Sequence, residues 1–516
     1  MNLRIGIDVG GTNTDAVLMD GTRVVAKIKT LTTADVTGGI TTALRHLLDH
    51  SGTPTVQVAG VMIGTTHFTN AVVERRHLQP TATVRLGLPA TAALPPMVDW
   101  PDDLAATIGR RVFLCHGGHE FDGSEISPFG EEEVKRAATA IAAAGITAIA
   151  VSAVFSPVNP AMEERAAALL RAAVPGAAVT LSHEIGRIGL LERENAAILN
   201  ACLRPLAATT IAAFRQAVAA LGITAPLYLT QNDGTLMAAD FAERYPVLTF
   251  ASGPTNSMRG AAFLSGLREA MVVDVGGTTT DVGALMQGFP REASVAIEIG
   301  GVRTNFRMPD VFSLGLGGGS LVQADPPRIG PQSVGFRLTE QTLIFGGETL
   351  TATDIAVAAG LAEIGDPSRV RHLAAPFVRA ALGRIQEMAA AAIDRMKTSP
   401  AAVPVIAVGG GSVLLGQPLA GASKLVKPEH FEAANAIGAA IAQISGEVDR
   451  VYSLATLSRD QALDAAKAEA TAKAVAAGAD PATIEIVDVE DIPLAYLPGN
   501  ATRVRVKAVG DLRLGG

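Results

Sequence analysis

Residues 4–15, Arg-Ile-Gly-Ile-Asp-Val-Gly-Gly-Thr-Asn-Thr-Asp, recur in closely similar form at residues 271–281, Met-Val-Val-Asp-Val-Gly-Gly-Thr-Thr-Thr-Asp. Each copy follows a short apolar run and precedes another, which is typical of two strands joined by a tight turn. One copy alone fits an ordinary β-turn equally well, but two nearly identical copies in one chain disfavour that interpretation. We therefore predict an α/β protein of two related halves, each of which opens with a β-meander.

The two predicted hairpins carry groups suited to phosphate and magnesium. Paired glycines let a backbone approach a phosphate without interference from Cβ atoms. Threonine hydroxyls can donate to phosphate oxygens, and carboxylates on both sides of a turn can hold Mg²⁺ directly or through water. The candidate phosphate-binding residues are Gly10, Gly11, Thr12, Asn13 and Thr14, and Gly276, Gly277, Thr278, Thr279 and Thr280. The candidate catalytic carboxylates are Asp8, Asp15, Asp274 and Asp281.

Other nucleotide-binding motifs fit less well. The glycines of a Rossmann loop open a helix, whereas here the chain continues as a strand, and the P-loop pattern Gly-x-x-x-x-Gly-Lys-Ser/Thr is absent.

Glycines also follow the apolar run at 405–408, where Gly409, Gly410 and Gly411 predict a turn that a purine and ribose could approach closely. A fourth glycine cluster, residues 313–320, either lines the cleft that would hold this purine and ribose or only forms a turn of the chain. Small residues within 433–444 would let a helix pack closely on another helix.

Composition excludes several classes of partner. The 516-residue chain has a net charge of −8, so nucleic acids and anionic membranes are disfavoured as partners. The most apolar stretch, residues 137–155, is interrupted at Gly145, whereas a membrane span needs about 20 unbroken apolar residues. No signal peptide precedes the first predicted strand, so we expect a soluble, cytoplasmic protein. Cys115 and Cys202 are too few for a disulfide framework.

Further segments of the chain carry a family resemblance. They are Gly-Thr-Thr-His-Phe-Thr-Asn-Ala-Val-Val-Glu-Arg at 64–75, Gly-Gly-His-Glu-Phe-Asp-Gly at 117–123, Phe-Ser-Pro-Val-Asn-Pro at 155–160, Leu-Ser-His-Glu-Ile-Gly at 181–186, Ala-Ser-Gly-Pro at 251–254 and Thr-Ala-Thr-Asp at 351–354. With the hairpins and the Gly-Gly-Gly-Ser loop, they make the chain resemble the actin–hexokinase–Hsp70 ATPase superfamily. Within it, the chain resembles the short hydantoinase A-type subunit of the hydantoinase/5-oxoprolinase family.

The resemblance implies two duplicated actin-like (ribonuclease H-like) ATPase halves with a nucleotide cleft between them. A small α+β appendage would follow at the C-terminal end. We expect the first half to span residues 1–195, the second half 196–450 and the appendage 451–516.

The resemblance also implies an activity. Family members are thought to use ATP to phosphorylate the amide oxygen of a hydantoin, 5-oxoproline or another lactam, so that water can open the ring. Asp8 and Asp274 would organise Mg²⁺, and either Asp15 or Asp281 would orient the attacking oxygen. The polar segment after Gly64 supplies candidate substrate contacts, which are Thr66, His67 and Asn70. A structural role for His67 is the alternative.

Departures from the family pattern leave other functions open. His67 stands where many relatives have an apolar residue, and Asn256-Ser257 stands where they have glycines. The long oxoprolinases continue into a second large region that this sequence does not contain, so either a separate hydantoinase B-type partner subunit supplies it or the protein works alone, and we expect the separate partner. A small-molecule kinase and a non-catalytic, nucleotide-switched regulatory subunit are the rival functions. His116 and His119 are interpreted as part of a loop, because a metal site needs three or four converging ligands.

Overall fold

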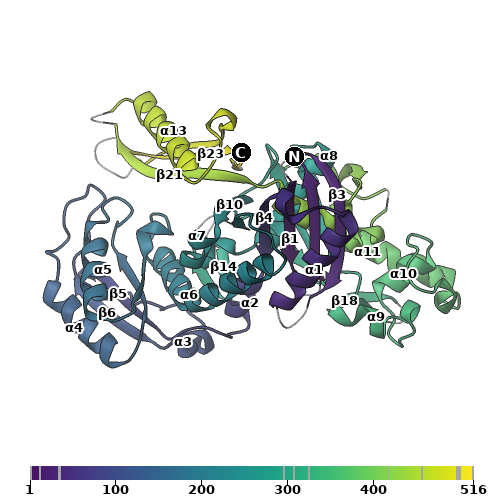
Figure 1. Ribbon diagram of the computed structural model, residues 1–516, viewed down its shortest axis with the longest axis horizontal. Coiled ribbons are helices and arrows are strands. Elements are labelled where there is room, and N and C mark those ends of the chain that lie inside the picture. The colour runs from purple at the N-terminus through teal and green to yellow at the C-terminus, as the bar shows by residue number, and fades with distance from the viewer. Residues whose placement is uncertain are drawn as a thin grey trace.

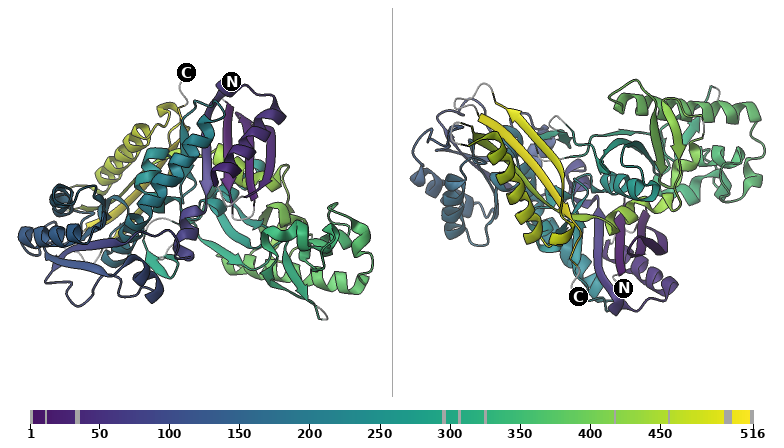
Figure 2. Two further views of the ribbon diagram at one scale, coloured as in Figure 1. Left: turned by 60° about the horizontal axis from the view of Figure 1, so that its bottom comes forward. Right: turned by 90° about the horizontal axis from the view of Figure 1, so that it is seen from above.

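A computed structural model describes most of the chain (Figure 1). The described residues are 3–10, 13–32, 36–293, 297–305, 308–323, 326–416, 418–454, 457–494 and 501–513. Gly11 and Thr12, which the sequence predicts to bind phosphate, lie outside them. The first strands lie in the middle of the molecule, with a blue and yellow lobe on one side and a green lobe on the other (Figure 2, left).

Each half is built on five strands in the same order. In the first half the order is β3-β2-β1-β4-β9, and in the second it is β16-β12-β11-β19-β20. In both halves the first three strands form an antiparallel meander, and the last two join in parallel. This repetition confirms the predicted fold class of duplicated actin-like α/β halves. The strands are β1 (Leu3–Val9), β2 (Asn13–Asp20), β3 (Arg23–Leu31), β4 (Val58–Thr65) and β9 (Leu227–Thr230), and β11 (Ala270–Val275), β12 (Thr280–Met286), β16 (Val311–Leu314), β19 (Val403–Val408) and β20 (Ala422–Val426).

Two helices lie between the sheets of the two halves and contact each other. α8 (Ser252–Ser265) follows the strands of the first half but packs on β11, β12 and β19 of the second. α12 (Ala434–Ala440) follows the strands of the second half but packs on β1, β2 and β4 of the first. Each helix therefore reaches the hairpin of the opposite half.

Small residues allow these two helices to cross closely, as the sequence predicted. A Cβ atom on Gly260 would lie 1.9 Å from the carbonyl oxygen of Ala434. A Cβ atom on Gly438 would lie 1.9 Å from the carbonyl oxygen of Asn256. The crossing thus requires glycine at both positions, because an ordinary side chain would overlap the backbone of the partner helix.

Between α2 and α6 the chain forms a separate parallel sheet in the order β6-β5-β7-β8. Arg85 of β5 forms a fully buried ion pair with Glu194 of α6, and Ser152 of β7 donates a 2.6 Å hydrogen bond to the same carboxylate. α6 is the described helix whose length and composition would suffice to cross a membrane, and most of that stretch is buried inside the protein, as in an ordinary core helix. The elements are α2 (His67–Val73), β5 (Thr81–Leu88), α3 (Asp102–Ile108), β6 (Arg111–His116), α4 (Glu131–Ala143), β7 (Ala148–Ala153), α5 (Ala161–Ala173), β8 (Ala178–Leu181) and α6 (Leu190–Ala219).

The C-terminal region extends the sheet of the first half. The full order of that sheet is β22-β23-β21-β10-β9-β4-β1-β2-β3, and α13 covers one face of the added strands (Figure 1). The predicted α+β composition is confirmed. The predicted boundaries after residues 195 and 450 fall inside α6 and β21, and they stay predictions. The added elements are β10 (Thr235–Ala238), β21 (Gln443–Ser453), α13 (Arg459–Ala476), β22 (Glu485–Pro493) and β23 (Ala501–Gly510).

The remaining elements include helices that cover the sheets of the two halves. α11 packs on β11, β12 and β16, so it closes the apolar core of the second half, and α1 packs on β2 and β3 in the same way in the first. These elements are α1 (Val36–Ser51), α7 (Ala239–Arg244), β13 (Phe289–Pro290), β14 (Ile297–Ile299), β15 (Val302–Thr304), β17 (Ser320–Gln323), β18 (Arg328–Ser333), α9 (Leu338–Gln341), α10 (Ala352–Ala358) and α11 (Ala375–Met396).

Candidate functional site

The two hairpins turn in the same way. In the first turn the Gly10 amide donates to the Asn13 carbonyl at 3.0 Å, and in the second the Gly276 amide donates to the Thr279 carbonyl at 2.9 Å. In the part of the chain that the structure describes, no hydrogen-bond partner is present for the amide of Gly277. Thr278 and Thr279 are exposed. A free amide beside exposed hydroxyls is suited to an anion such as phosphate.

Asp8 and Asp274, the inner carboxylates of the two hairpins, are joined by a polar bridge. Asn435 on α12 donates from Nδ2 to Asp8 Oδ2 at 3.2 Å. The Ser257 hydroxyl on α8 lies 2.8 Å from Asn435 Oδ1 and hydrogen-bonds to Asp274 Oδ2. The crossing of α8 and α12 therefore brings the carboxylates of both halves to one place, although 266 positions separate them in sequence (274 − 8).

The surroundings of these two carboxyl groups disfavour their ionised, negatively charged form. Burial raises the pKa of Asp8 to about 7, and the charges of Asp15 and Asp274 add to this effect. Burial also raises the pKa of Asp274 to about 6, with a further contribution from the charge of Asp281. A bound cation would remove this opposition, because an opposite charge favours the ionised carboxylate.

One carboxylate oxygen at this place is left without a partner. Asp8 Oδ1 is buried and accepts no hydrogen bond from the described residues. Gly64 lies beside it, since a Cβ atom there would lie 2.8 Å from this oxygen. Buried polar atoms are normally satisfied. Mg²⁺ is commonly held by one or two carboxylates, with water and phosphate oxygens completing its shell, so Asp8 and Asp274 fit this ion.

No other metal cluster is apparent. Within the described residues, no group of three or more His, Cys, Asp or Glu side chains is arranged to hold a metal ion. A cation at the hairpins would therefore need ligands beyond these side chains. His116 ends strand β6 and hydrogen-bonds to Glu133 at 2.8 Å, and His119 is buried and forms an isolated β-bridge with Glu125, so neither lies in the simple loop that the sequence predicted.

The outer carboxylates have different partners in the two halves. Asp15 forms an ion pair with Lys29 on the neighbouring strand β3, with 2.6 Å between Lys29 Nζ and Asp15 Oδ1. Asp281 accepts a hydrogen bond from Ser313 on β16. Burial raises the pKa of both carboxyls, and in Asp15 the Lys29 ammonium opposes this shift.

The Gly-Gly-Gly loop lies against the second hairpin. Gly409 has φ of +80°, and a Cβ atom there would lie 2.2 Å from Asp274 Oδ1. A Cβ atom on Gly411 would lie 2.8 Å from the Gly276 carbonyl oxygen, whereas Gly410 is exposed and faces open space. The predicted close approach of bare backbone is thus present beside Asp274. A 3₁₀ turn over Gly410–Leu414 follows the strand.

The fourth glycine cluster supports the second turn from behind. The Gly318 amide donates to the Gly276 carbonyl at 3.0 Å, and the Gly319 amide donates to the Gly277 carbonyl at 2.7 Å. The cluster therefore packs on the second hairpin, a role that neither of the two predicted interpretations described.

The candidate substrate residues follow β4, next to the first hairpin. Gly64 pairs with Asp8 across β1 and β4, just as Val408 pairs with Asp274 across β11 and β19. The segment from Thr66 is thus the counterpart of the Gly-Gly-Gly loop. These candidates are Thr66, His67 and Asn70, of which Asn70 Nδ2 lies 3.4 Å from Thr66 Oγ1. Burial lowers the pKa of His67, which favours its neutral form.

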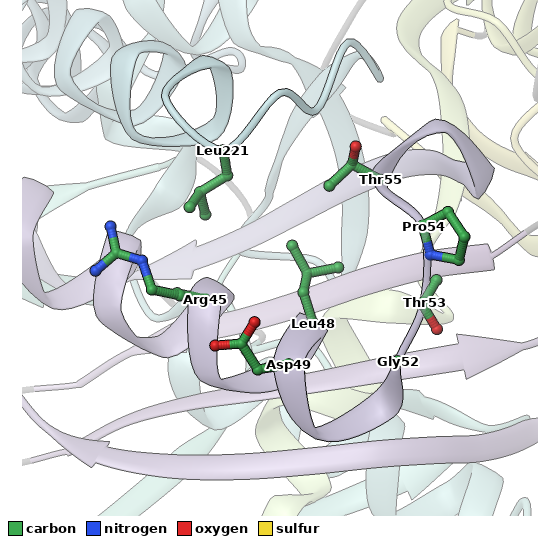
Figure 3. A pocket seen from close by; sticks show the side chains of 8 residues that line it. All are labelled: Arg45, Leu48, Asp49, Gly52, Thr53, Pro54, Thr55 and Leu221. Carbon is green, nitrogen blue, oxygen red and sulfur yellow. The ribbon is translucent and has the colours of Figure 1, made fainter.

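A surface hollow of about 510 Å³ lies away from the carboxylates (Figure 3). Arg45, Asp49 and Leu221 are among its lining residues. It lies where α1 ends and the chain enters β4 at Val58, which pairs with Leu3 at the far end of β1 from Asp8. This hollow is therefore separate from the hairpin site.

Two family models match the chain in succession. The hydantoinase/oxoprolinase N-terminal region matches residues 4–174, and the hydantoinase/oxoprolinase model matches residues 193–364. The chain belongs to the hydantoinase/oxoprolinase family. Each match contains one of the two hairpins, whereas the Gly-Gly-Gly loop and α12 lie outside both matches.

Relatives of this chain are named for activities of two kinds. Caprolactamase subunit alpha of Pseudomonas jessenii is 29% identical over 469 residues, which is 85% of this chain and 65% of that protein. Acetophenone carboxylase gamma subunit of Aromatoleum aromaticum is 29% identical over 391 residues, or 69% of this chain and 53% of that protein. The chain thus spans about half to two thirds of the length of these curated relatives.

A solved structure shows the same fold over nearly all of the chain. The crystal structure of the ATP-dependent caprolactamase from Pseudomonas jessenii aligns with a TM-score of 0.78 at 21% identity, covering 99% of this chain and 88% of that chain. At this identity the likeness concerns the fold alone.

The sequence did not point to three residues of the site as functional. Lys29 is one of several polar residues on β3, and Asn435 lies on a helix of small residues. Ser257 lies on α8, whose Ser-Gly-Pro start carries the family resemblance but gives Ser257 itself no role. A weak signal was present for Asn435, which is a polar residue inside the apolar run 433–442. Ser257 had been noticed only as a departure from the family pattern.

Proposed function

We propose that the chain binds Mg²⁺ and ATP between its two hairpins and uses them to activate a cyclic amide for ring opening. The observation that carries the proposal is the bridge from Asp8 through Asn435 and Ser257 to Asp274. This bridge supports a single site shared by both halves. It links the carboxylates Asp8 and Asp274, and each of them lies beside the glycine turn of its own half.

The proposed roles follow from the chemistry of the residues. Asp8 and Asp274 would hold Mg²⁺, and Asp15 or Asp281 would accept the proton of the attacking oxygen. The phosphates would lie on the two glycine turns, and the nucleoside would lie against the third glycine cluster. The proposed phosphate and nucleoside contacts are Gly10, Gly11, Thr12, Asn13, Gly276, Gly277, Thr278, Thr279, Gly409, Gly410 and Gly411.

The substrate would lie beside the first hairpin. Thr66, His67 and Asn70 follow β4, next to Asp8, and neutral His67 can either donate or accept one hydrogen bond to an amide. When bound, ATP would supply a phosphoryl group to the carbonyl oxygen of the amide, which would make the carbonyl carbon electrophilic enough for water to attack it and for the C–N bond of the ring to break, with the nitrogen leaving as the amine. The chain's own part is to hold both reactants in line and to exclude water until the oxygen is activated.

A second candidate function is activation of a ketone for carboxylation. The acetophenone carboxylase gamma subunit favours it, because that relative is as similar in sequence as the caprolactamase subunit. Both activities begin at a carbonyl oxygen, so the same hairpin site would serve either. We further propose that a separate hydantoinase B-type subunit completes the enzyme, since the relatives named above are themselves subunits.

Phosphate release from Mg·ATP tests the proposal. The purified chain would be assayed alone and with a hydantoinase B-type protein, in the presence of hydantoins, 5-oxoproline, larger lactams, or ketones with bicarbonate. Asp8→Asn and Asp274→Asn should abolish release, whereas exposed Asp99→Asn should leave it unchanged. Stimulation by lactams with ring opening supports the amidohydrolase, and stimulation by ketones supports the carboxylase.

Other outcomes point to the rival functions. A stable phosphorylated product would identify a small-molecule kinase. Binding of ATP without stimulation under any condition would identify a regulatory subunit. Absence of ATP binding would contradict the proposed site altogether.

A further inference from the structure

The two hairpins are nearly identical in sequence, but different residues face their outer carboxylates. In the first half, Asp15 of β2 stands in register with Lys29 of β3. In the second half, Asp281 of β12 stands at the equivalent register position to Ser313 of β16. The third strand of each meander, which lies outside the repeated motif, therefore breaks the symmetry of the site.

This difference changes the charge on the two sides. Lys29 Nζ lies 2.6 Å from Asp15 Oδ1 and 2.8 Å from Asp15 Oδ2, so it contacts both oxygens of the carboxylate. Asp281 receives only a hydroxyl hydrogen bond, and the described residues contain no cation paired with it. The first hairpin thus carries an ammonium group, whereas the second carries none.

The ammonium group of Lys29 can donate a further hydrogen bond to a ligand. A lysine ammonium has three N–H donors, and Asp15 accounts for the two hydrogen-bond contacts of Lys29 among the described residues. The side chain is 44% exposed, so a ligand can reach it. Its charge also acts on Asp8 and Asp274, for which it is the cation that lowers the pKa.

We propose that Lys29 binds the terminal phosphate of the nucleotide and that Asp15 is a positioning residue that holds the ammonium in place. Four carboxylates surround the site, so a polyphosphate placed there needs a cation of the protein in addition to Mg²⁺. Lys29 supplies it on the side of the first hairpin. Asp281, which pairs with no cation among the described residues, then remains as the carboxylate for the attacking oxygen.

This inference rests on the proposed binding of ATP between the hairpins and adds the orientation of the bound nucleotide. The terminal phosphate would face the first half. The nucleoside would lie toward the second half, where Gly410 leaves open space. The alternative is that Lys29 only neutralises the buried carboxylate of Asp15 and never contacts a ligand.

A double-mutant experiment separates the two roles. Affinities for Mg·ATP and Mg·ADP would be measured by calorimetry for the wild type, Lys29→Gln, Asp15→Asn and the double variant. Urea unfolding of the same nucleotide-free proteins would report stability. Lys27→Gln is the matched control, because Lys27 lies on the same strand and also pairs with a carboxylate, that of Glu432.

We expect Lys29→Gln to lower the preference for ATP over ADP by about tenfold, since a hydrogen bond between charged groups contributes about this much. Lys29→Gln should also lower stability, because Asp15 loses its cation. The double variant should recover that stability but not the preference for ATP. Lys27→Gln should keep the wild-type preference.

Two results would overturn the inference while leaving the proposed function intact. One is an unchanged ATP preference in Lys29→Gln, and the other is recovery of that preference in the double variant. If the wild type binds neither nucleotide, the proposed function fails, and this inference fails with it.

Discussion

Replacing Asp8 by Asn is expected to stabilise the nucleotide-free protein at pH 8, although it removes a central residue of the site. Asp8 is only 6% exposed, and burial together with the charge of Asp15 raises its pKa from 3.8 to about 7. The folded protein therefore favours a neutral group at this position. The Asp8→Asn side chain is neutral at every pH, and its amide oxygen can still accept the hydrogen bond from Asn435.

The magnitude follows from the linkage between proton binding and stability. Below pH 3.8 the carboxyl is neutral in the folded and unfolded chain, so its contribution is fully present. Between pH 3.8 and about 7 the unfolded chain loses the proton that the folded protein keeps, so stability falls as pH rises. Within this window, each rise of one pH unit lowers the free energy of unfolding by about 1.4 kcal/mol. The loss of stability between pH 5 and pH 7 is therefore roughly 3 kcal/mol.

Urea unfolding at pH 5 and pH 8 measures this effect. The wild type should lose roughly 3 kcal/mol more than Asp8→Asn over that interval, because all other titrating groups are shared. The exposed Asp99→Asn variant is the control and should follow the wild type. Equal pH dependence of Asp8→Asn and the wild type would refute the reasoning.

Two further predictions concern the packing that supports the site. Gly438→Ala should destabilise the protein by roughly 1 to 3 kcal/mol or more, because its Cβ would overlap the backbone of α8, and it should weaken ATP binding by separating the two hairpins. Gly383→Ala on α11 is its control, where open space and helix propensity predict a gain of up to about 1 kcal/mol. Glu194→Gln should cost roughly 3 to 5 kcal/mol in urea unfolding, because it leaves Arg85 charged and buried. Glu192→Gln, which disrupts a partly exposed ion pair, should cost less than about 1 kcal/mol.

Much of the fold was predictable because its signals are local. Alternation of apolar residues and a pair of turn glycines define each hairpin within about a dozen residues, and the repetition of that pattern indicated two halves. The α+β character of the C-terminal region was also visible. Its continuity with the first sheet was not, because the pairing of Thr235 with Gln443 joins strands more than 200 positions apart.

The candidate site was predictable only in part, for the same reason. The four aspartates and the glycines belong to the repeated motif and were recognised from it. The partners that give those aspartates different properties lie elsewhere in the chain: Asn435 is 427 positions from Asp8, and its hydrogen bond follows from the packing of α12 on β1. Single polar residues of this kind have no spacing or periodicity that would mark them in a sequence.

The sequence by itself determined the repeated strand–turn–strand units and the types of group at their tips, because backbone turns and strand alternation depend on neighbouring residues. The tertiary structure decided which of these groups meet and how they differ. The crossing of α8 and α12 joins Asp8 to Asp274, and the third strand of each meander places an ammonium beside Asp15 but a hydroxyl beside Asp281. Charge and burial at a site depend on everything that packs around it, so two copies of one motif came to differ through residues outside the motif.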